Sequence, residues 1–217
     1  MSKTKINIFS LRRNYNQEHL SEKTLSKNPF IQFETWMNSA LEKNLEEPNA
    51  MHLSTVNKKN KPSSRIVLLR GFNKKGFVFY TNYLSQKGVE LTSNPYAALT
   101  FFWAELERQV RIEGTVEKVS KALSNAYFKS RPRESQLGAW ASHQSAVLKN
   151  REELEETMKN LTKKYEGKSI PRPNYWGGFC LKPERIEFWQ GRPNRLHDRI
   201  LYQKTKGNKW AISRLSP

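Results

Sequence analysis

Cysteine is almost absent from this sequence of 217 residues, in which Cys180 is the single example. One cysteine excludes an internal disulfide and any metal site built on cysteine pairs. The four histidines are far apart and lack the close pairing of a helical zinc motif, so we expect no metal site. No basic-then-apolar leader opens the chain, and no apolar run is long enough to span a bilayer. We therefore expect a soluble, cytoplasmic protein without membrane contact.

Acidic residues are also few, since 20 Asp and Glu stand against 38 Lys and Arg and give a formal charge of +18. Such a charge attracts anions, and nucleic acid is always one candidate. The basic residues are scattered along the whole chain rather than gathered in one tail or helix face. Small phosphorylated metabolites are therefore an equally open class of partner.

Hydrophobic residues are below the usual share at 36%, but 6 Trp, 8 Tyr and 11 Phe concentrate the apolar area in large side chains. That area can form the core of one compact domain, or of a dimer that shares a core. Residues 1–28 are polar, lysine-rich and without periodicity, so we expect a mobile N-terminal arm. Residues 29–217 then form a single domain.

The periodicity of the chain changes several times between helical and strand spacing. Helical spacing is found at 29–41, after Ser85, and at 120–129 and 151–165. Strand-like segments cover 51–56, 64–72, 77–81, 96–103, 108–119, 175–181, 185–190, 194–203 and 210–215. Mostly antiparallel strands with helices at the edges predict a mainly-β fold, a closed or split barrel.

One stretch concentrates chemistry near the end of the chain. On a strand, Arg195, His197 and Arg199 would share a face, because side chains two apart point the same way. A turn at Gly191 to Pro193 would fold Trp189 against them. Cations beside a flat aromatic ring predict a planar ligand that carries phosphate, although an ordinary basic strand facing water has the same pattern.

Three further groups could bind anions. Ser85 and Lys87 at a helix start would make a phosphate site with free backbone N–H groups. Arg65 and Arg70 bracket an apolar run and suggest ligands at the rim of a barrel. Tyr127, Arg131 and Ser135 are spaced four apart and could line one helix face, although Pro132 requires a break there. Solvated polar residues are the alternative interpretation of the last group.

Taken together, several motifs resemble the pyridoxamine/pyridoxine 5′-phosphate oxidase family. The segments Ile186 to Gln190 and Arg195 to Arg199 resemble its signature. Other matches, in order and at compatible spacing, are Arg65 to Leu69, Phe79 to Asn82, Leu106 to Val110, Ser130 to Arg133, Gln136 to Ser142, Trp176 to Phe179 and Arg214-Leu215. The resemblance covers the chain from about Leu11 onward. It implies a homodimeric, FMN-binding split β-barrel with FMN at the subunit interface.

The resemblance also implies site residues and a reaction. The FMN-binding residues would be Arg65, Ile66, Val67, Leu68, Leu69, Arg70, Tyr80, Thr81, Gln86, Lys87, Gln109, Gln144, Ser145, Trp189 and Arg199. The substrate-binding residues would be Arg12, Tyr15, Arg70, Tyr127, Arg131, Ser135, Arg195 and His197, with Arg195 and His197 as the catalytic pair and residues Arg12 and Tyr15 in a lid. The implied reaction oxidises pyridoxamine or pyridoxine 5′-phosphate to pyridoxal 5′-phosphate, with O2 as acceptor and H2O2 as product.

Two positions depart from the family's usual residues. Arg70 stands where the family usually has Lys, which replaces a point charge by a planar fork. Gln86 stands where it usually has Arg, so we expect a weaker hold on the FMN phosphate. Another split-barrel flavin or haem protein and a basic nucleic-acid-binding barrel are the rival hypotheses.

Overall fold

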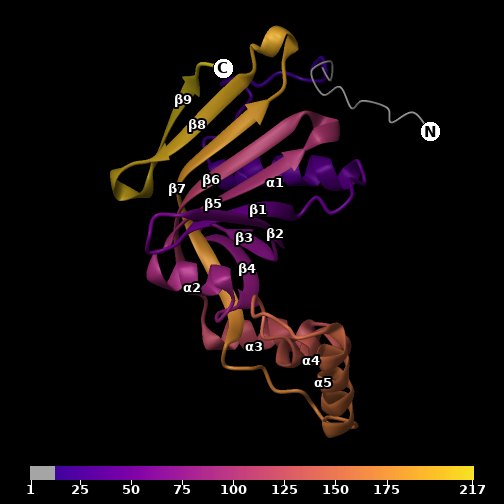
Figure 1. The fold of residues 1–217 in the computed structure, drawn as a ribbon. Coiled ribbons are helices and arrows are strands. Elements are labelled where there is room, and N and C mark those ends of the chain that lie inside the picture. Colours follow the sequence, from indigo (N-terminus) through magenta and orange to yellow (C-terminus); the bar gives the residue numbers. More distant parts are fainter. Residues whose placement is uncertain (1–12) are drawn as a thin grey trace, which may run out of the picture. The chain divides into compact units, whose positions relative to one another are not determined.

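A computed structural model describes residues 13–217, and Figure 1 draws the helices and strands along the chain. The α-helices are α1 (Pro29–Glu42), α2 (Gln86–Ser93), α3 (Lys121–Ser130), α4 (Arg133–Ala141) and α5 (Arg151–Lys164). The strands are β1 (Ala50–Val56), β2 (Pro62–Leu68), β3 (Gly71–Asn73), β4 (Gly76–Asn82), β5 (Tyr96–Trp103), β6 (Arg108–Lys118), β7 (Trp176–Gln190), β8 (Asp198–Lys204) and β9 (Trp210–Leu215). Short 3₁₀ turns are η2 (Ala104–Leu106), η3 (Pro193–Arg195) and η4 (Lys206–Asn208).

The chain divides into two compact units. Unit 1 holds the described residues up to Pro48, together with Phe102–Val110 and Ile186–Pro217. Unit 2 holds Asn49–Phe101 and Arg111–Arg185.

Unit 2 is built on an antiparallel sheet. The strand order is β2-β1-β5-β6-β7-β4-β3, in which β1 pairs with β2 and β5, and β4 pairs with β3 and β7. Residues of β6 alternate between buried and less buried, as expected where one face of a strand packs on a core. Fully buried side chains of this core include Leu53, Phe77, Phe79 and Leu99.

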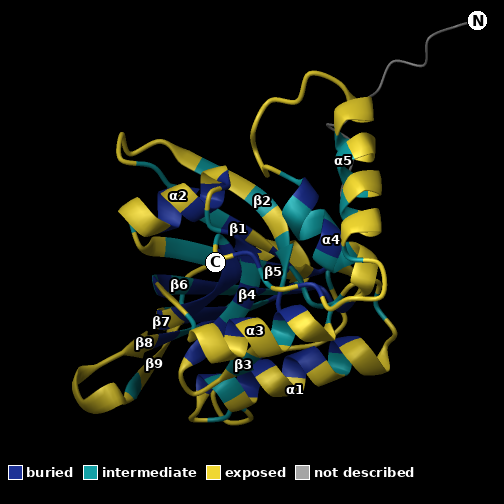
Figure 2. Ribbon diagram, turned by 90° about the horizontal axis from the view of Figure 1, so that it is seen from below, coloured by how far each residue is buried: buried dark blue, intermediate teal, exposed yellow. Residues whose placement is uncertain are grey.

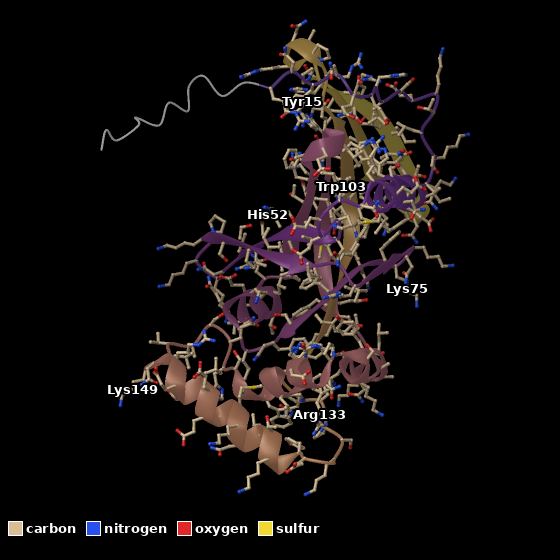
Figure 3. The ribbon with its side chains drawn as sticks, turned by 90° about the vertical axis from the view of Figure 1, so that its right-hand side faces the viewer. Tyr15, His52, Lys75, Trp103, Arg133 and Lys149 are labelled. Carbon is tan, nitrogen blue, oxygen red and sulfur yellow. The ribbon has the colours of Figure 1, made fainter. Side chains whose placement is uncertain are left out.

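Helices α3, α4 and α5 of unit 2 surround a second, smaller core. Its buried members are Phe128, Leu137, Ile170 and Trp176. Figure 2 shows α5 mostly in yellow, and none of its residues is buried, because the helix lays only a narrow stripe on α4. Arg133, labelled in Figure 3, donates to the backbone oxygens of Tyr165 and Lys168 and so ties α4 to the end of α5.

Unit 1 joins α1 to the C-terminal hairpin of β8 and β9, the two yellow strands that lie side by side in Figure 1. Helix α1 begins where the Asn28 side chain accepts a hydrogen bond from the Phe30 N–H, with Pro29 in the first turn. Its buried face packs aromatic rings on β7, where the Trp36 and Phe188 centroids lie 5.1 Å apart.

Residues 13–28 are attached to unit 1 by hydrogen bonds over long sequence separations. The Leu20 N–H donates to Asp198 at 3.0 Å, and the Tyr202 hydroxyl donates to the Ser26 carbonyl at 2.7 Å. Arg214 forms an ion pair with Glu22 at 2.7 Å. The arm therefore has specific partners on β8 and β9.

The predicted mainly-β fold with helices at its edges is confirmed, and most predicted elements are found within two residues of their expected ends. Three predictions were wrong. The segment 64–72 is interrupted at Leu69 and Arg70 between β2 and β3. The segments 175–181 and 185–190 form one continuous strand, β7, because Pro183 inside it does not break the ladder. The expected strand at 194–203 begins only at Asp198.

Candidate functional site

A cavity of about 510 Å³ opens in unit 2, and we call it the cationic cavity. It is lined by Arg65, Ile66, Val67, Leu68, Arg70, Tyr80, Thr81, Asn82, Lys87, Tyr127, Arg131, Gln144 and Trp176. Four of these residues are cations and none of them is acidic. Like charges on one surface repel, so this lining favours an anionic ligand.

One pair of cations comes from β2 and the start of α2. The Ser85 hydroxyl caps α2 by accepting from the Gly88 N–H, which directs the first turn and Lys87 toward the cavity. The Lys87 ammonium is buried and lies 3.3 Å from the Thr81 hydroxyl and 3.4 Å from that of Ser85. Burial lowers the pKa of Lys87, and the charge of Arg65 lowers it further. Hydroxyl partners leave this positive charge available to an anion.

A second group surrounds Arg131. Its guanidinium lies 4.5 Å from the centre of the Trp176 ring, and its Nη1 atom is buried without a hydrogen-bond partner among the described residues. Tyr80 and Tyr127 are stacked beside it with centroids 3.8 Å apart. Burial lowers the pKa of Arg131. An unsatisfied buried donor is costly, so this atom is suited to a ligand oxygen.

The predicted group of Tyr127, Arg131 and Ser135 is only partly brought together on one surface. Tyr127 and Arg131 both line the cationic cavity, whereas Ser135 is not among its lining residues. The break expected at Pro132 is confirmed, and the three residues therefore do not line one helix face. Helix α3 ends at Ser130, Arg131 is extended, and α4 starts after Pro132, whose ring cannot continue a helix.

A second cavity, of about 660 Å³, lies in unit 1, and we call it the hairpin cavity. It is lined by Arg13, Asn14, Tyr15, Trp189, Arg192, Asn194, Arg195 and His197. The rings of Trp189 and His197 lie 4.7 Å apart, which confirms that the hairpin folds this tryptophan against the imidazole. Tyr15, labelled in Figure 3, contacts both rings edge-on at 5.7 Å and 5.6 Å.

Gly191 makes room for the arm over the hairpin. A Cβ atom at this position would lie 2.7 Å from Cγ of Tyr15. A side chain here would therefore displace the tyrosine.

The hydrogen bonding of His197 fixes its neutral tautomer. The backbone N–H of Arg192 donates to Nδ1 of His197 at 3.1 Å, so the neutral ring carries its proton on Nε2. Burial lowers the pKa of His197, and the neighbouring charge of Arg195 lowers it further. The imidazole is thus a neutral Nε2–H donor at neutral pH.

The prediction that Arg195, His197 and Arg199 share one strand face was wrong. Asn194 and Arg195 have φ values of 56° and 62° in the left-handed region, so the chain turns here instead of extending. Arg195 and His197 share the hairpin cavity, but Arg199 is not among its lining residues. Arg199 instead donates to Glu187 on β7 at 2.8 Å.

The other predicted cofactor residues are divided among several places. Gln144 lines the cationic cavity and accepts from the Thr81 hydroxyl at 3.4 Å. Gln86 and Ser145 line a neighbouring cavity, and the Gln86 N–H donates to the Ser145 hydroxyl at 3.2 Å. The predicted cofactor residues Leu69 and Gln109 line neither the cationic cavity nor the hairpin cavity. Arg12, which was predicted to bind the substrate, lies outside the described residues.

Sequence reasoning missed the role of Trp176. The ring forms the base on which Arg131 lies and is stacked with Tyr80 at 5.6 Å. The Gly177-Gly178 pair that follows Trp176 could have indicated this close packing from the sequence. A Cβ at Gly178 would lie 2.9 Å from the Tyr80 ring, so the glycine permits this close packing.

Within residues 13–217, no cluster of three or more His, Cys, Asp or Glu side chains is arranged to hold a metal ion. None of the helices in that range has the length and apolar character needed to cross a bilayer.

Two family descriptions match this sequence over most of its length. Residues 37–165 match the family described as pyridoxamine 5′-phosphate oxidase. Residues 176–217 match the pyridoxine 5′-phosphate oxidase C-terminal dimerisation region.

Curated relatives and solved structures agree with these matches. A pyridoxine/pyridoxamine 5′-phosphate oxidase of Gloeothece citriformis is 58% identical, covering 97% of this chain and 98% of the relative. One of Acaryochloris marina is 53% identical, covering 99% and 97%. The structure of PhzG from Burkholderia lata, in complex with tetrahydrophenazine-1-carboxylic acid, has a TM-score of 0.85 at 29% identity, covering 90% of this chain and 95% of that one. An FMN-binding protein of Nostoc punctiforme, related to pyridoxamine 5′-phosphate oxidase, has a TM-score of 0.70 at 17% identity over 89% and 100%.

Proposed function

This chain belongs to the pyridoxamine 5′-phosphate oxidase family, and we propose that the residues lining its two cavities bind and orient the flavin and the phosphorylated substrate of that reaction. The protein is a homodimeric FMN-dependent oxidoreductase with the split-barrel fold. It oxidises pyridoxamine or pyridoxine 5′-phosphate to pyridoxal 5′-phosphate.

The observation that carries the assignment of residues is the presence of two separate cation groups in one cavity. Beyond the effect of burial, the charge of Arg65 lowers the pKa of Lys87 and the charge of Arg70 lowers the pKa of Arg131, which divides the four cations into two groups. FMN and the substrate each bring one phosphate, so two groups match two anions. The unpartnered Nη1 of Arg131 and the buried ammonium of Lys87 are donors of the kind that phosphate oxygens satisfy.

FMN fits the first group and the lining beside it. Arg65 and Lys87 would hold its phosphate, while Tyr80, Thr81 and Gln144 would contact the rest of the molecule. Bound FMN supplies the two-electron chemistry of the reaction. Contacts of further residues with FMN stay predictions, namely those of Gln86, Ser145, Trp189, Arg199, Gln109 and residues Ile66 to Leu69. The placement of FMN at the subunit interface also stays a prediction.

The substrate phosphate is assigned to the second group. Arg131 would donate its free Nη1 to a phosphate oxygen, with Tyr127 and Arg70 beside it and Ser135 as a further predicted partner. The Trp176 ring holds the Arg131 guanidinium in place through a cation–π contact. An Arg at position 70 offers two parallel donors where Lys would offer a point charge.

The resemblance to the family assigns contacts with the pyridine ring to Arg195 and His197, which line the hairpin cavity. His197 would donate from Nε2 to an oxygen or nitrogen substituent of the ring, and Arg195 would supply a positive charge next to it. The arm residue Tyr15, and Arg12 before it, would cover this group and exclude water, which is the predicted lid function. His197 and Arg195 would thus hold the substrate in a reactive orientation without taking part in bond making or breaking.

The overall reaction balances with O2 as the acceptor. Pyridoxine 5′-phosphate and O2 give pyridoxal 5′-phosphate and H2O2. Pyridoxamine 5′-phosphate, O2 and water give pyridoxal 5′-phosphate, ammonia and H2O2. A cytoplasmic location stays a prediction, to be checked by cell fractionation.

The test is O2-dependent formation of pyridoxal 5′-phosphate by the FMN-loaded protein and by an Arg131→Ala variant. We expect the variant to raise KM for the phosphorylated substrate by about 100-fold, because a buried charge-assisted hydrogen bond is lost. Lys129→Ala, which removes an exposed cation from the last turn of α3 just before Arg131, is the matched control and should leave KM unchanged. A colourless protein that forms no product, or equal KM values in both variants, would refute the assignment.

A further inference from the structure

A buried carboxylate lies next to the first cation group. Glu90 is 5% exposed on α2. Its Oε2 atom accepts from the hydroxyls of Thr55 at 2.5 Å and Ser63 at 2.8 Å, and from Nη2 of Arg65 at 3.3 Å. Its Oε1 atom accepts from the Gln86 amide at 2.9 Å. Four donors thus converge on one carboxylate at the edge of the cationic cavity.

The same groups hold the far end of Arg65. Its Nη1 atom donates to the Thr55 hydroxyl at 2.5 Å and the Leu53 carbonyl at 3.2 Å, and Nη2 donates to the Ser63 hydroxyl at 2.6 Å as well as to Glu90. A free arginine side chain has many rotamers, and it loses them when it binds a ligand. Here that entropy is lost during folding, so the guanidinium is preorganised.

Glu90 also balances the two cations of this group. Lys87 and Arg65 repel each other, and the charge of Glu90 acts in the opposite direction on Lys87. Although burial alone would raise the pKa of Glu90, the hydrogen bonds from Thr55, Gln86 and Ser63 lower it, so the side chain is an anion. Two cations against one carboxylate leave a net positive charge for a phosphate.

We propose that Glu90 is a positioning residue for the cofactor phosphate, which it serves by fixing the Arg65 guanidinium at the wall of the cationic cavity. This inference rests on the proposed function, which assigns Arg65 and Lys87 to the phosphate of FMN. Glu90 lines the neighbouring cavity with Gln86 and Ser145 rather than the cationic cavity, and it reaches the first cation group through its ion pair with Arg65. Its removal should weaken only the part of flavin binding that depends on the phosphate.

The experiment compares FMN with riboflavin, which has the same ring and side chain but no phosphate. Flavin-free protein is titrated with each, and quenching of flavin fluorescence gives both Kd values. We expect Glu90→Ala to raise the FMN Kd about tenfold while the riboflavin Kd changes less than about twofold. Glu113→Ala is the matched control, because Glu113 pairs with Arg111 at 2.7 Å in the same unit away from the cavity, and it should change neither value.

Two further measurements, with Glu90→Gln and in an Arg65→Ala background, test whether Glu90 acts through Arg65. Glu90→Gln keeps the volume and one acceptor oxygen, and it should raise the FMN Kd by about threefold, so the test does not depend on the folding of Glu90→Ala. In an Arg65→Ala background, replacing Glu90 should have no further effect on the ratio of the two Kd values.

Two results would overturn the inference. Equal weakening of FMN and riboflavin would assign Glu90 a merely structural role, and tighter FMN binding would show that it competes with the phosphate. A wild-type protein that binds FMN no more tightly than riboflavin would instead refute the phosphate site itself, and the proposed function with it.

Discussion

Replacing Trp176 by leucine should separate the stability of unit 2 from recognition of the substrate phosphate. The ring is buried in the α3–α4–α5 core and lies 4.5 Å from the Arg131 guanidinium. A half-buried cation–π contact contributes about 1 kcal/mol, so its loss should lower kcat/KM for the phosphorylated substrate roughly fivefold. Loss of the large ring should also lower the free energy of unfolding by roughly 2–4 kcal/mol.

The matched control is Leu137→Ala, which removes a side chain from the same core without touching Arg131. It should lower stability by a similar amount, about 2–4 kcal/mol. The assay is the ratio of kcat/KM for pyridoxamine 5′-phosphate to that for pyridoxamine, together with urea unfolding of each variant. Only Trp176→Leu should lower this ratio. A ratio that falls equally in both variants would refute the role given to the cation–π contact.

Three further predictions concern pH, salt and cofactor. The pKa of His197 lies below its ordinary value of 6.5, so this ring becomes protonated only at a pH below that value. We therefore expect protonation of His197 to lower kcat/KM only below pH 6.5. An inflection above about pH 7 that disappears in His197→Asn would contradict this. Gln86→Arg should make flavin loading complete and resistant to high-salt gel filtration, whereas the wild-type protein should lose flavin there. The hydrogen bond from Arg214 lowers the pKa of Glu22 to about 2, so its stabilising effect should be complete above the unfolded value of about 4.5 and disappear as the pH falls toward 2. Glu22→Gln should remove that part of the dependence of Tm on pH, and an unchanged profile would contradict the assignment.

Local sequence patterns predicted α1, α2, α3, α5 and most strands because their causes are local, whereas α4 was not predicted. Asn28 and Ser85 each cap a helix through their own side chain, and the helices were predicted to begin directly after these two residues. The alternation of β6 comes from the one buried face of each strand. Such signals need no knowledge of distant parts of the chain.

The site was less predictable, because its geometry depends on contacts made over long distances. Alternation predicted a strand through Arg195, but two left-handed residues turn the chain, and Arg199 pairs with Glu187 on β7. Spacing alone also placed Ser135 on one helix face with Tyr127, although a proline ends that helix. The resemblance to a known family supplied the substrate assignment, which charge and spacing had left open.

The attachment of residues 13–28 to β8 and β9 has a consequence for biosynthesis. Glu22 is separated from its partner Arg214 by 192 positions, and Ser26 from Tyr202 by 176. On the ribosome, the arm is therefore exposed for nearly the whole time of translation before its partners emerge. Nascent chains that stall before Arg214 should leave this segment open to proteases.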